Sequence, residues 1–463
     1  MSRSIALVLL AIAVFASASC GLTVRPATWT QIHSEKTNTG FNAVRSVLAD
    51  PQVKLWSAPV GQLSVSSPAV GPDGTVYIGN LAGEAVAINP DGTPRWRRLL
   101  GSRIVATPAV HTQTGEIVFV VQNPLTQTDY LSFLYRLSPA GDILAVSTEQ
   151  NLFTSSAPKI WREHVFLQTG VRYGQGGETI VAGGYVYVFD RTRLQVVAKA
   201  APSCGHPICG GSGFFEHLLE MLSCLVQLQI PAHCRDFEGK PGPTHEPSVA
   251  IVDARNAVDD PDRPTVLAAT GLCAVAMRFD PSATFDHRLR QLWGQKLVGD
   301  CADPVWCASP TVTPGGQVVF GAATYRYDKG RTRSFDVRTG VQLWERDLDA
   351  AVRWAPVAFL RQIYVVTSDR LVVFDSDGTP SHEAPLQGTG HAAALSLEHV
   401  HVTTSAGVHT FRLDPRQGSS FDGTIADPGV TWPARAIPAL AQDGTLYVST
   451  PNGFLHAYRP GSP

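Results

Sequence analysis

The chain has 463 residues, a formal net charge of −2 and 44% hydrophobic residues. This is enough apolar sequence for a large buried core, and too neutral a chain for a protein that binds nucleic acid through phosphate contacts. Charged residues make up only 16%, while glycine (41) and proline (33) are frequent, a balance that favours many short strands over helices. No Walker A loop, HExxH, GxSxG or DxDxDG calcium loop is present, which excludes the enzyme classes that these motifs mark.

The first 19 residues predict a cleaved export signal. Arg3 supplies the positive start, Ile5 to Phe15 is apolar but too short to span a bilayer, and small residues lead to Cys20. Two cleavages are open, an ordinary signal-peptidase site after Ala18 or lipidation of Cys20 as in bacterial lipoproteins. We therefore expect an exported protein. It is a periplasmic, outer-membrane or cell-surface lipoprotein tethered by one end, or a secreted protein if Cys20 is not lipidated.

A repeated unit follows, first as SSPAVGPDGTVYIGNLAGEAVAINPDGTPRW at residues 66–96. It reads as four short strands, SPAV, TVYIG, AVAIN and one around the tryptophan, separated by turn residues. Most copies lie 37 to 50 residues apart, the size of one propeller blade. The small-Pro-apolar start of the unit recurs at Pro68, Pro108, Pro158, Pro247, Pro310, Pro356 and Pro438, with Ala393 in the proline position of one further copy. Eight copies predict an all-β, eight-bladed β-propeller.

The two ends of the chain predict how the ring closes. The last copy supplies three strands and no fourth, whereas Val53 to Ser57 (VKLWS) is an isolated strand of the fourth kind before the first copy. We expect this N-terminal strand to complete the last blade, which removes free sheet edges. The predicted domains are a signal peptide at 1–19, a tether and lead-in at 20–50, and the propeller at 51–463.

The unit SSPAVGPDGTVYIGN…AINPDG…W resembles the repeat of the pyrroloquinoline-quinone (PQQ)-like propellers. Trp29 to Gly40 (WTQIHSEKTNTG) also resembles the lead-in of the exported members, and the likeness extends over roughly residues 29–460. That superfamily contains quinone-dependent dehydrogenases, an outer-membrane assembly lipoprotein and binding proteins without known chemistry. The fold therefore does not fix the function.

The resemblance is nearer to the non-enzymatic exported members. The dehydrogenases stack PQQ on a ring of two adjacent disulfide-bonded cysteines and hold calcium, but this sequence has no Cys-Cys pair. No position matches their calcium ligands or catalytic base. We expect no cofactor and no catalysis, with a PQQ-binding or other small-ligand oxidoreductase as the alternative. An outer-membrane protein assembly lipoprotein is the second alternative.

Long connections predict that one face of the ring carries the function. In a propeller, the loops between the second and third strands of a blade and the loops between blades emerge on the same face. Here they are long in blades 2 to 5, at 122–129, 170–184, 201–243 and 322–331. Ser212 to Ile230 has helical spacing, so we expect a small helical insertion between blades 3 and 4.

The cysteines after Cys20 all fall on this face. In an exported protein they predict a disulfide-stapled cap on the insertion, with 204–209, 224–234 and 301–307 as local pairings and Cys273 as the free thiol. A zinc site is the alternative, but the paired CxxC spacing is missing, so we expect no metal. The disulfide candidates are Cys204, Cys209, Cys224, Cys234, Cys301 and Cys307.

Two groups of side chains are candidates for binding on the same face. The first precedes the innermost strands, at the mouth of the central channel, where guanidinium and aromatic groups suit a planar anionic ligand; packing between blades is the alternative. It comprises Arg103, Trp306, Arg353, Trp354, His391 and Arg435. The second is a basic loop tip expected to contact a partner, comprising Tyr325, Arg326, Tyr327, Lys329 and Arg331.

Other conspicuous side chains are expected to pack between blades. His401 takes the place of Tyr77 and Tyr364 in its strand, and the repeat tryptophans are Trp56, Trp96, Trp293 and Trp344. Together these features predict a monomeric, non-catalytic scaffold. It binds an envelope protein or polymer through the capped face and touches the membrane only through a lipid at Cys20.

Overall fold

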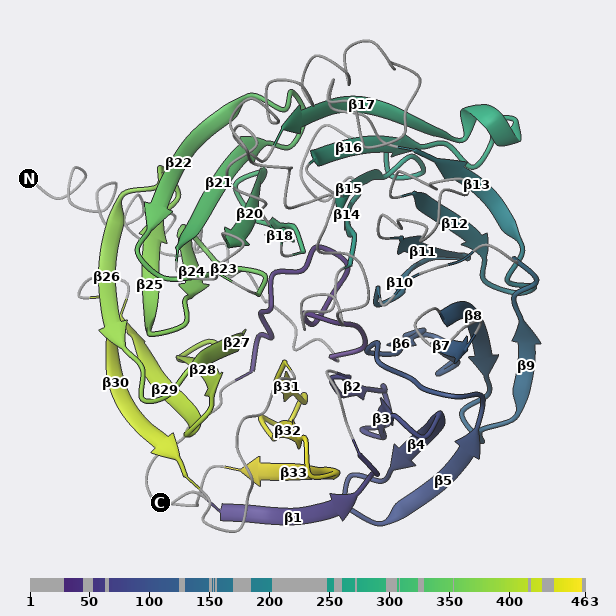
Figure 1. Cartoon of the computed structure of the whole chain (residues 1–463), viewed down its shortest axis with the longest axis horizontal. Helices are drawn as coiled ribbons and strands as arrows, with labels where there is room; N and C mark the ends of the chain where they lie inside the picture. Colours follow the sequence, from purple (N-terminus) through teal and green to yellow (C-terminus); the bar gives the residue numbers. More distant parts are fainter. Residues whose placement is uncertain are drawn as a thin grey trace, which may run out of the picture.

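The computed structural model describes residues 29–44, 53–62, 66–124, 130–149, 152, 154, 156–169, 185–201, 248–253, 260–270, 273–296, 306–307, 309–323, 329–352, 354–414, 418–426 and 437–459. They form eight antiparallel sheets arranged as a ring (Figure 1). The all-β, eight-bladed propeller is therefore confirmed. Each sheet runs in chain order from the axis outward, and the last sheet alone takes its outer strand from the other end of the chain.

The strands of the first four blades are β2 (Ala69–Val70), β3 (Val76–Gly79), β4 (Glu84–Ile88) and β5 (Pro94–Leu99); β6 (Ala109–Val110), β7 (Ile117–Pro124), β8 (Tyr130–Leu137) and β9 (Ile143–Val146); β10 (Lys159–Trp161), β11 (His164–Gln168), β12 (Val186–Asp190) and β13 (Val196–Ala200); β14 (Ala250–Val252), β15 (Thr265–Thr270), β16 (Cys273–Phe279) and β17 (Leu289–Lys296). A short 3-10 helix, η2 (Phe285–His287), precedes β17.

The strands of the last four blades are β19 (Thr311–Val312), β20 (Gln317–Ala323), β21 (Gly330–Asp336) and β22 (Gln342–Leu348); β23 (Val357–Phe359), β24 (Gln362–Val366), β25 (Arg370–Asp375) and β26 (Pro380–Pro385); β27 (Gly390–Leu395), β28 (His399–Thr404), β29 (Gly407–Asp414) and β30 (Gly418–Ile425); β31 (Ala439–Leu440), β32 (Leu446–Thr450), β33 (Phe454–Arg459) and β1 (Val53–Pro59). In blade 5 an additional strand, β18 (Trp306–Cys307), pairs with β20.

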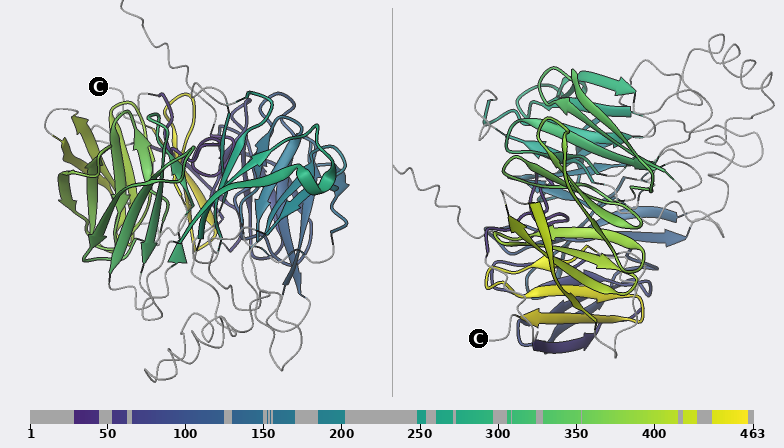
Figure 2. Two further views of the ribbon diagram at one scale, coloured as in Figure 1. Left: turned by 90° about the horizontal axis from the view of Figure 1, so that it is seen from above. Right: turned by 90° about the vertical axis from the view of Figure 1, so that its left-hand side faces the viewer.

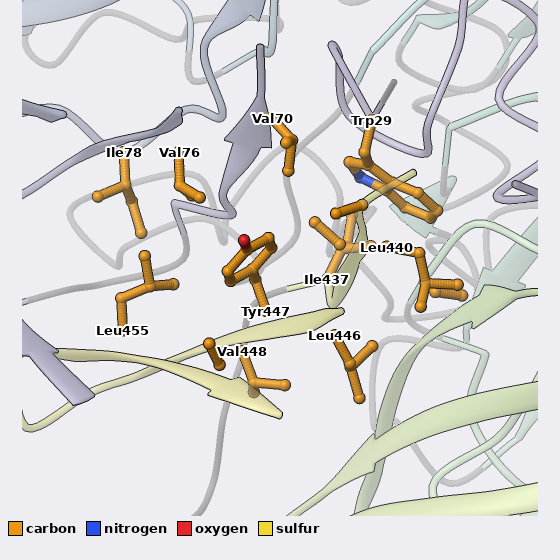
Figure 3. Packing of buried hydrophobic residues seen from close by; sticks show 14 of the residues in the cluster. Trp29, Val70, Val76, Ile78, Ile437, Leu440, Leu446, Tyr447, Val448 and Leu455 are labelled. Carbon is orange, nitrogen blue, oxygen red and sulfur yellow. The ribbon is translucent and has the colours of Figure 1, made fainter. Parts of the chain in front are cut away.

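The last blade is built from both ends of the chain, as expected from the isolated N-terminal strand. Strand β1 pairs antiparallel with β33, from Val53 opposite Arg459 to Pro59 opposite Phe454. Apolar side chains of β32 and β33 then pack against those of the first blade in one buried cluster, and Figure 3 shows Leu455 facing Ile78 across this junction. Closure removes the open edge that an incomplete last sheet would expose.

The repeat tryptophans join neighbouring blades, which confirms them as packing residues. Trp96 in β5 donates its indole N–H to the carbonyl oxygen of Pro139 in the next blade at 2.9 Å. Its ring lies against Gly141, where a Cβ atom would come within 2.8 Å of the ring. The equivalent pairs in other blades are Trp56 with Pro90, Trp293 with Val337 and Trp344 with Ser376.

Residues 29–44 occupy the centre of the ring, where they are drawn in purple in Figure 1. They belong to the predicted tether and lead-in at 20–50, and Trp29, Asn38 and Asn42 within them are fully buried. The segment bonds to the innermost strand of every blade in chain order. The partners are Trp29 with Val70, Thr30 with Val110, Gln31 with Ile160, Lys36 with Ile251, Thr37 with Val312, Thr39 with Ala358, Gly40 with Leu395 and Asn42 with Leu440.

Several predicted segments lie outside the described residues. These are the signal peptide at 1–19, Cys20 and the helical insertion at 201–243, of which only residue 201 is described. Within the described part of the chain, the helix is η2. No helix in that part is long and apolar enough to cross a membrane.

Candidate binding face

The ring has two faces with different loops. Turns between the first and second strands, and between the third and fourth, emerge on what we call the plain face. Most of them are tight, with Gly74 and Gly92 at φ +81° and +88°, the backbone that Asp-Gly turns favour. Blade 4 is the exception, with residues 253–264 between β14 and β15 and residues 280–288, which include η2, between β16 and β17. The other connections emerge on what we call the elaborated face. Figure 2 shows the ring edge-on, with the two faces on opposite sides.

The elaborated face carries a hairpin formed by β7 and β8, which we call the blade 2 hairpin. Its strands have eight residues each, whereas β3 and β4 in blade 1 have four and five. The two strands pair without a break from Ile117 opposite Leu137 to Pro124 opposite Tyr130. In Figure 2 (right) this blue hairpin extends beyond the neighbouring blades.

The base of the blade 2 hairpin is anchored on both sides. Arg103, a predicted ligand-binding residue, donates from Nε to Oε1 of Gln122 at 2.7 Å, and the two residues also exchange backbone hydrogen bonds. Gln122 is buried and donates from Nε2 to the carbonyl oxygen of Thr154 in blade 3 at 2.6 Å. Ser102 donates its N–H to Oδ1 of Asn123 at 3.0 Å. Arg103 therefore braces the hairpin against the connection from blade 1.

The other channel-mouth candidates are buried or incompletely described. Trp354 and His391 are only 4% and 8% exposed, and Trp354 packs in the same apolar cluster as Trp29. For Trp306 the structure describes the backbone of β18, and Arg353 and Arg435 lie outside the described residues. A planar-anion site at this mouth stays a prediction.

Part of the predicted basic loop tip belongs to a strand. Arg331 lies in β21, where its Nε pairs with Oδ1 of Asp347 at 2.5 Å and with Oε1 of Glu345 at 3.3 Å. Lys329 is exposed just before this strand, and Tyr325, Arg326 and Tyr327 lie outside the described residues. Arg331 thus has a role in holding β21 to β22, and partner contact by the loop stays a prediction.

An exposed leucine next to the blade 2 hairpin was not identified from the sequence. Leu99 ends β5 on the elaborated face and is 71% exposed. The chain then runs directly into Ser102 and Arg103, which the hairpin holds. A leucine in an outer strand is unremarkable in a sequence, and only its position beside the anchored connection distinguishes it. Single exposed apolar side chains are common on protein surfaces, so the interest of Leu99 lies in this position.

The histidines of blade 7 are packing residues, as predicted for His401. That side chain is fully buried and shares a 3.1 Å hydrogen bond between its Nδ1 and Oγ1 of Thr410. Burial lowers its pKa to about 3, with a further effect from His399. His399 pairs through Nε2 with Asp422 at 2.9 Å. Among the described residues no group of three or more histidine, cysteine or acidic side chains is placed to hold a metal ion.

The cysteines do not enter the described site. Cys204, Cys209, Cys224, Cys234 and Cys301 lie outside the described residues. Cys273 and Cys307 are described only as backbone, in β16 and β18. The disulfide pairings and the free thiol therefore stay predictions.

Buried charged residues between blades 2 and 3 were also not identified from the sequence. Arg191 is 7% exposed and pairs with Glu116 and Glu163, which come from different blades. Lys159 is fully buried beside residues 29–44. A basic residue at the end of a short apolar strand carries no sequence signal for burial, because its partners are distant in the chain.

Comparison with known proteins supports the propeller architecture both by sequence family and by similarity to solved structures. A family model described as outer membrane protein assembly factor BamB matches residues 41–201 and 328–460, more than half of the chain. The structure of BamB from Moraxella catarrhalis is similar at 12% identity and a TM-score of 0.55, over 88% of this chain and 99% of that one. A search among curated proteins finds no match.

Two solved dehydrogenases are similar in fold as well. A europium-containing methanol dehydrogenase gives 12% identity and a TM-score of 0.59, over 92% of this chain and 90% of that one. The quinohemoprotein alcohol dehydrogenase ADHIIG from Pseudomonas putida HK5 gives 11% identity and a TM-score of 0.58, over 95% of this chain and 82% of that one. Likenesses at such low identity show the fold alone.

Proposed function

Because the chain belongs to the family of the outer membrane protein assembly factor BamB, we propose that it is an exported, non-catalytic scaffold in the assembly of outer-membrane proteins. It binds a protein of the cell envelope through the elaborated face, at a surface that includes the blade 2 hairpin and Leu99. The predicted cap at 201–243 and the loop at 322–331 belong to the same face and extend this surface.

The observation that carries the proposal is the contrast between the centre of the ring and its elaborated face. The centre holds residues 29–44, which bond to every blade. With the centre filled, the loops on the faces of the ring are the part left to bind a partner. On the elaborated face the blade 2 hairpin is long and is braced by Arg103 and Gln122. A projecting hairpin whose base is braced in this way suits a protein partner, because the braced part loses little entropy on binding.

The N-terminal tether favours the same face. We propose that Cys20 carries a lipid, as its position after Ala18 and Ser19 suggests. The chain from Cys20 to Trp29 then spans at most about 30 Å when fully extended. Trp29 accepts a hydrogen bond from Val70, the last residue of β2 before its turn on the plain face. The lipid would hold the plain face toward the membrane and leave the elaborated face free for a partner.

A pair of matched turn replacements tests the proposal. In the first variant, residues 124–130 are replaced by Asn-Gly, which closes a two-residue hairpin because Asn123 and Leu131 lie directly opposite each other. In the control, Leu360-Arg361 on the plain face is replaced by Asn-Gly between Phe359 and Gln362, which also lie opposite each other. Each tagged full-length protein is purified from the envelope, and the co-purifying outer-membrane assembly components are quantified by mass spectrometry.

The proposal predicts that the shortened hairpin loses most of these components, while the control retains them. Equal recovery from both variants, with both folded by circular dichroism, would exclude the blade 2 hairpin as part of the binding surface. Equal loss of the co-purifying components from both variants would show that the effect of the shortened hairpin is not specific to the elaborated face.

A further inference from the structure

Residues 29–44 contact the ring in the way that a bound peptide contacts a receptor. The segment forms no strand of any blade, and its β-type pairing is limited to isolated bridges such as Phe41 with Leu395. It is held instead by equivalent groups on successive blades. In six blades an innermost strand donates a backbone N–H to a carbonyl oxygen of the segment, at 2.7 to 3.0 Å. These donors are Val70, Val110, Ile251, Val312, Ala358 and Leu395.

These inward-facing N–H donors need acceptors at the axis of the ring, and a polypeptide main chain can supply them. A buried N–H without an acceptor costs about 1–3 kcal/mol, so each of these blades needs an acceptor at the axis. A peptide main chain supplies one carbonyl per residue at regular spacing. The ring thus presents a set of backbone donors that binds the carbonyl oxygens of a main chain independently of most side chains.

Two asparagines of the segment add sequence selectivity. Asn38 is fully buried, and its Nδ2 lies within 3.1 Å of Oγ of Ser248 and within 3.1 and 2.9 Å of the carbonyl oxygens of Val249 and Pro310. It thereby links blades 4 and 5, with its own backbone at φ +59°, a region that asparagine tolerates better than most residues. Asn42 is also buried and donates from Nδ2 to the carbonyl oxygen of Leu440 at 2.8 Å.

A buried cation adds electrostatic selectivity. Lys159 of β10 is fully buried and donates from Nζ to the carbonyl oxygens of Ile32 and Glu35. A buried ammonium group is costly without hydrogen-bond acceptors, and here the segment provides both of these acceptors. On the neighbouring blade, Asp253 pairs with Lys36 of the segment and accepts a hydrogen bond from Nε1 of Trp161 at 3.2 Å.

From these contacts we infer that the centre of the ring is a polypeptide-binding site, which the chain fills with its own residues 29–44 as an exchangeable intramolecular ligand. Its ligand class is a peptide segment that contains turns, with positive φ at the positions of His33 and Ser34. It has an apolar aromatic residue at the position of Trp29 and asparagines at those of Asn38 and Asn42. A second copy of the chain could supply the same segment. The inference is independent of the partner that binds the elaborated face.

The test cuts the covalent connection between residues 29–44 and the ring and leaves the segment in place. A protease recognition sequence is placed within residues 45–52 of the full chain, between the segment and β1, and the purified protein is cleaved. A fluorescent synthetic peptide of residues 29–44 is added in excess, and its incorporation into the ring is followed by fluorescence anisotropy and size-exclusion chromatography. Competing unlabelled peptides are the native sequence, a scrambled sequence, Asn38→Ala and the control Thr37→Ser, which keeps the hydroxyl that reaches Glu35.

We expect the cleaved N-terminal fragment to co-elute with the ring and to exchange with the labelled peptide. The Asn38→Ala peptide should compete at least about tenfold less well than the native sequence, since it loses several buried hydrogen bonds, and the Thr37→Ser peptide about equally well. A second variant, Lys159→Met, should accelerate loss of the fragment. Equal competition by the scrambled peptide would overturn the inference. It would also be overturned if the fragment never exchanged, or left only as the ring unfolded by circular dichroism.

Discussion

Leu194 in blade 3 occupies the turn position that Gly340 holds in blade 5. In both turns the N–H of this residue donates to the carbonyl oxygen of an aspartate four residues earlier at 2.9 Å, and φ is positive, +55° and +69°. Gly340 lies under the ring of Trp293 from the preceding blade, where a Cβ atom would come within 2.6 Å. Where Leu194 replaces glycine, the tryptophan position of the preceding blade holds Ala145, in one apolar cluster with Leu194. At one junction a large Trp293 packs on a small Gly340, and at the other a small Ala145 packs with a large Leu194.

This exchange predicts strong coupling between the two positions. Ala145→Trp alone should lower the free energy of unfolding by about 1–3 kcal/mol, because the fully buried Leu194 fills the space. Leu194→Gly alone should also destabilise, through loss of buried apolar surface. The double variant should recover much of the loss, giving a coupling free energy above about 1 kcal/mol in a urea-unfolding cycle. Additive effects of the two substitutions would contradict the exchange.

Arg191 should be a main electrostatic contributor to the junction of blades 2 and 3. Its guanidinium is buried between Glu116, whose side chain is 18% exposed, and Glu163, whose side chain is 62% exposed. Arg191→Met leaves Glu116 with Arg136, at 3.5 Å, as its remaining ion-pair partner among the described residues, and we expect a loss of about 1–3 kcal/mol in the free energy of unfolding. Glu163→Gln should cost under about 1 kcal/mol because that carboxylate is solvated. Similar urea-unfolding midpoints for the two variants would show that the buried pair contributes little.

Buried histidines should make the protein less stable in acid. Burial lowers the pKa of His401 to about 3, and burial with the nearby Lys159 lowers the pKa of His33 to about 3. An unfolded histidine titrates near 6.5, so between about pH 6.5 and 3 the unfolded chain binds protons that the native state does not. The free energy of unfolding therefore falls as the pH is lowered through this window, and the histidine contribution levels off below it.

A paired substitution isolates the contribution of His401. Combining His401→Phe with Thr410→Val removes the titrating ring and its hydrogen-bond partner together. Urea unfolding between pH 4 and 6 should then show a shallower dependence on pH, by one proton or about 1.4 kcal/mol per pH unit. The control is Thr410→Val alone, which removes the hydrogen-bond partner but keeps the titrating ring and should therefore keep the slope. An unchanged slope in the paired variant would place the acid sensitivity elsewhere.

The alternative of a PQQ-binding oxidoreductase predicts cofactor uptake. We expect no saturable change in tryptophan fluorescence when the purified mature protein is titrated with PQQ and calcium. The buried Trp354 packs in the cluster that contains Trp29, where its ring is already covered by protein. Saturable quenching that is lost on changing Arg353 and Trp354 together would favour the small-ligand function over the scaffold.

Much of the fold could be predicted from the sequence because each blade repeats one local pattern. The small-Pro-apolar start and the fourth-strand tryptophan gave the number of blades even where Ala393 replaces proline. The isolated strand at Val53 likewise indicated closure, since a ring leaves one place for an unpaired fourth strand. These features depend on local spacing, which a sequence displays directly.

The candidate site was less predictable because burial depends on distant partners. Residues 30–39 (TQIHSEKTNT) are mostly polar and carry no sequence signal for burial, yet they are held by strand ends from all parts of the chain. Arg103 and Trp354 were correctly placed before innermost strands, but their exposure is set by Gln122 and by the central cluster. Leu194 breaks the glycine pattern of its turn, and only the structure shows Ala145 compensating.

If a protein partner binds the elaborated face, side chains on that face should contact it in the cell. Leu99 and Leu360 provide a matched pair of exposed leucines, 71% and 60% exposed, on the elaborated and plain faces respectively. A photo-crosslinking amino acid placed at each position in the full-length protein, with irradiation in living cells, measures which face touches a partner. We expect a discrete adduct with an outer-membrane assembly protein from position 99 and none from position 360. An adduct from position 360 alone, or equal adducts from both, would contradict this expectation.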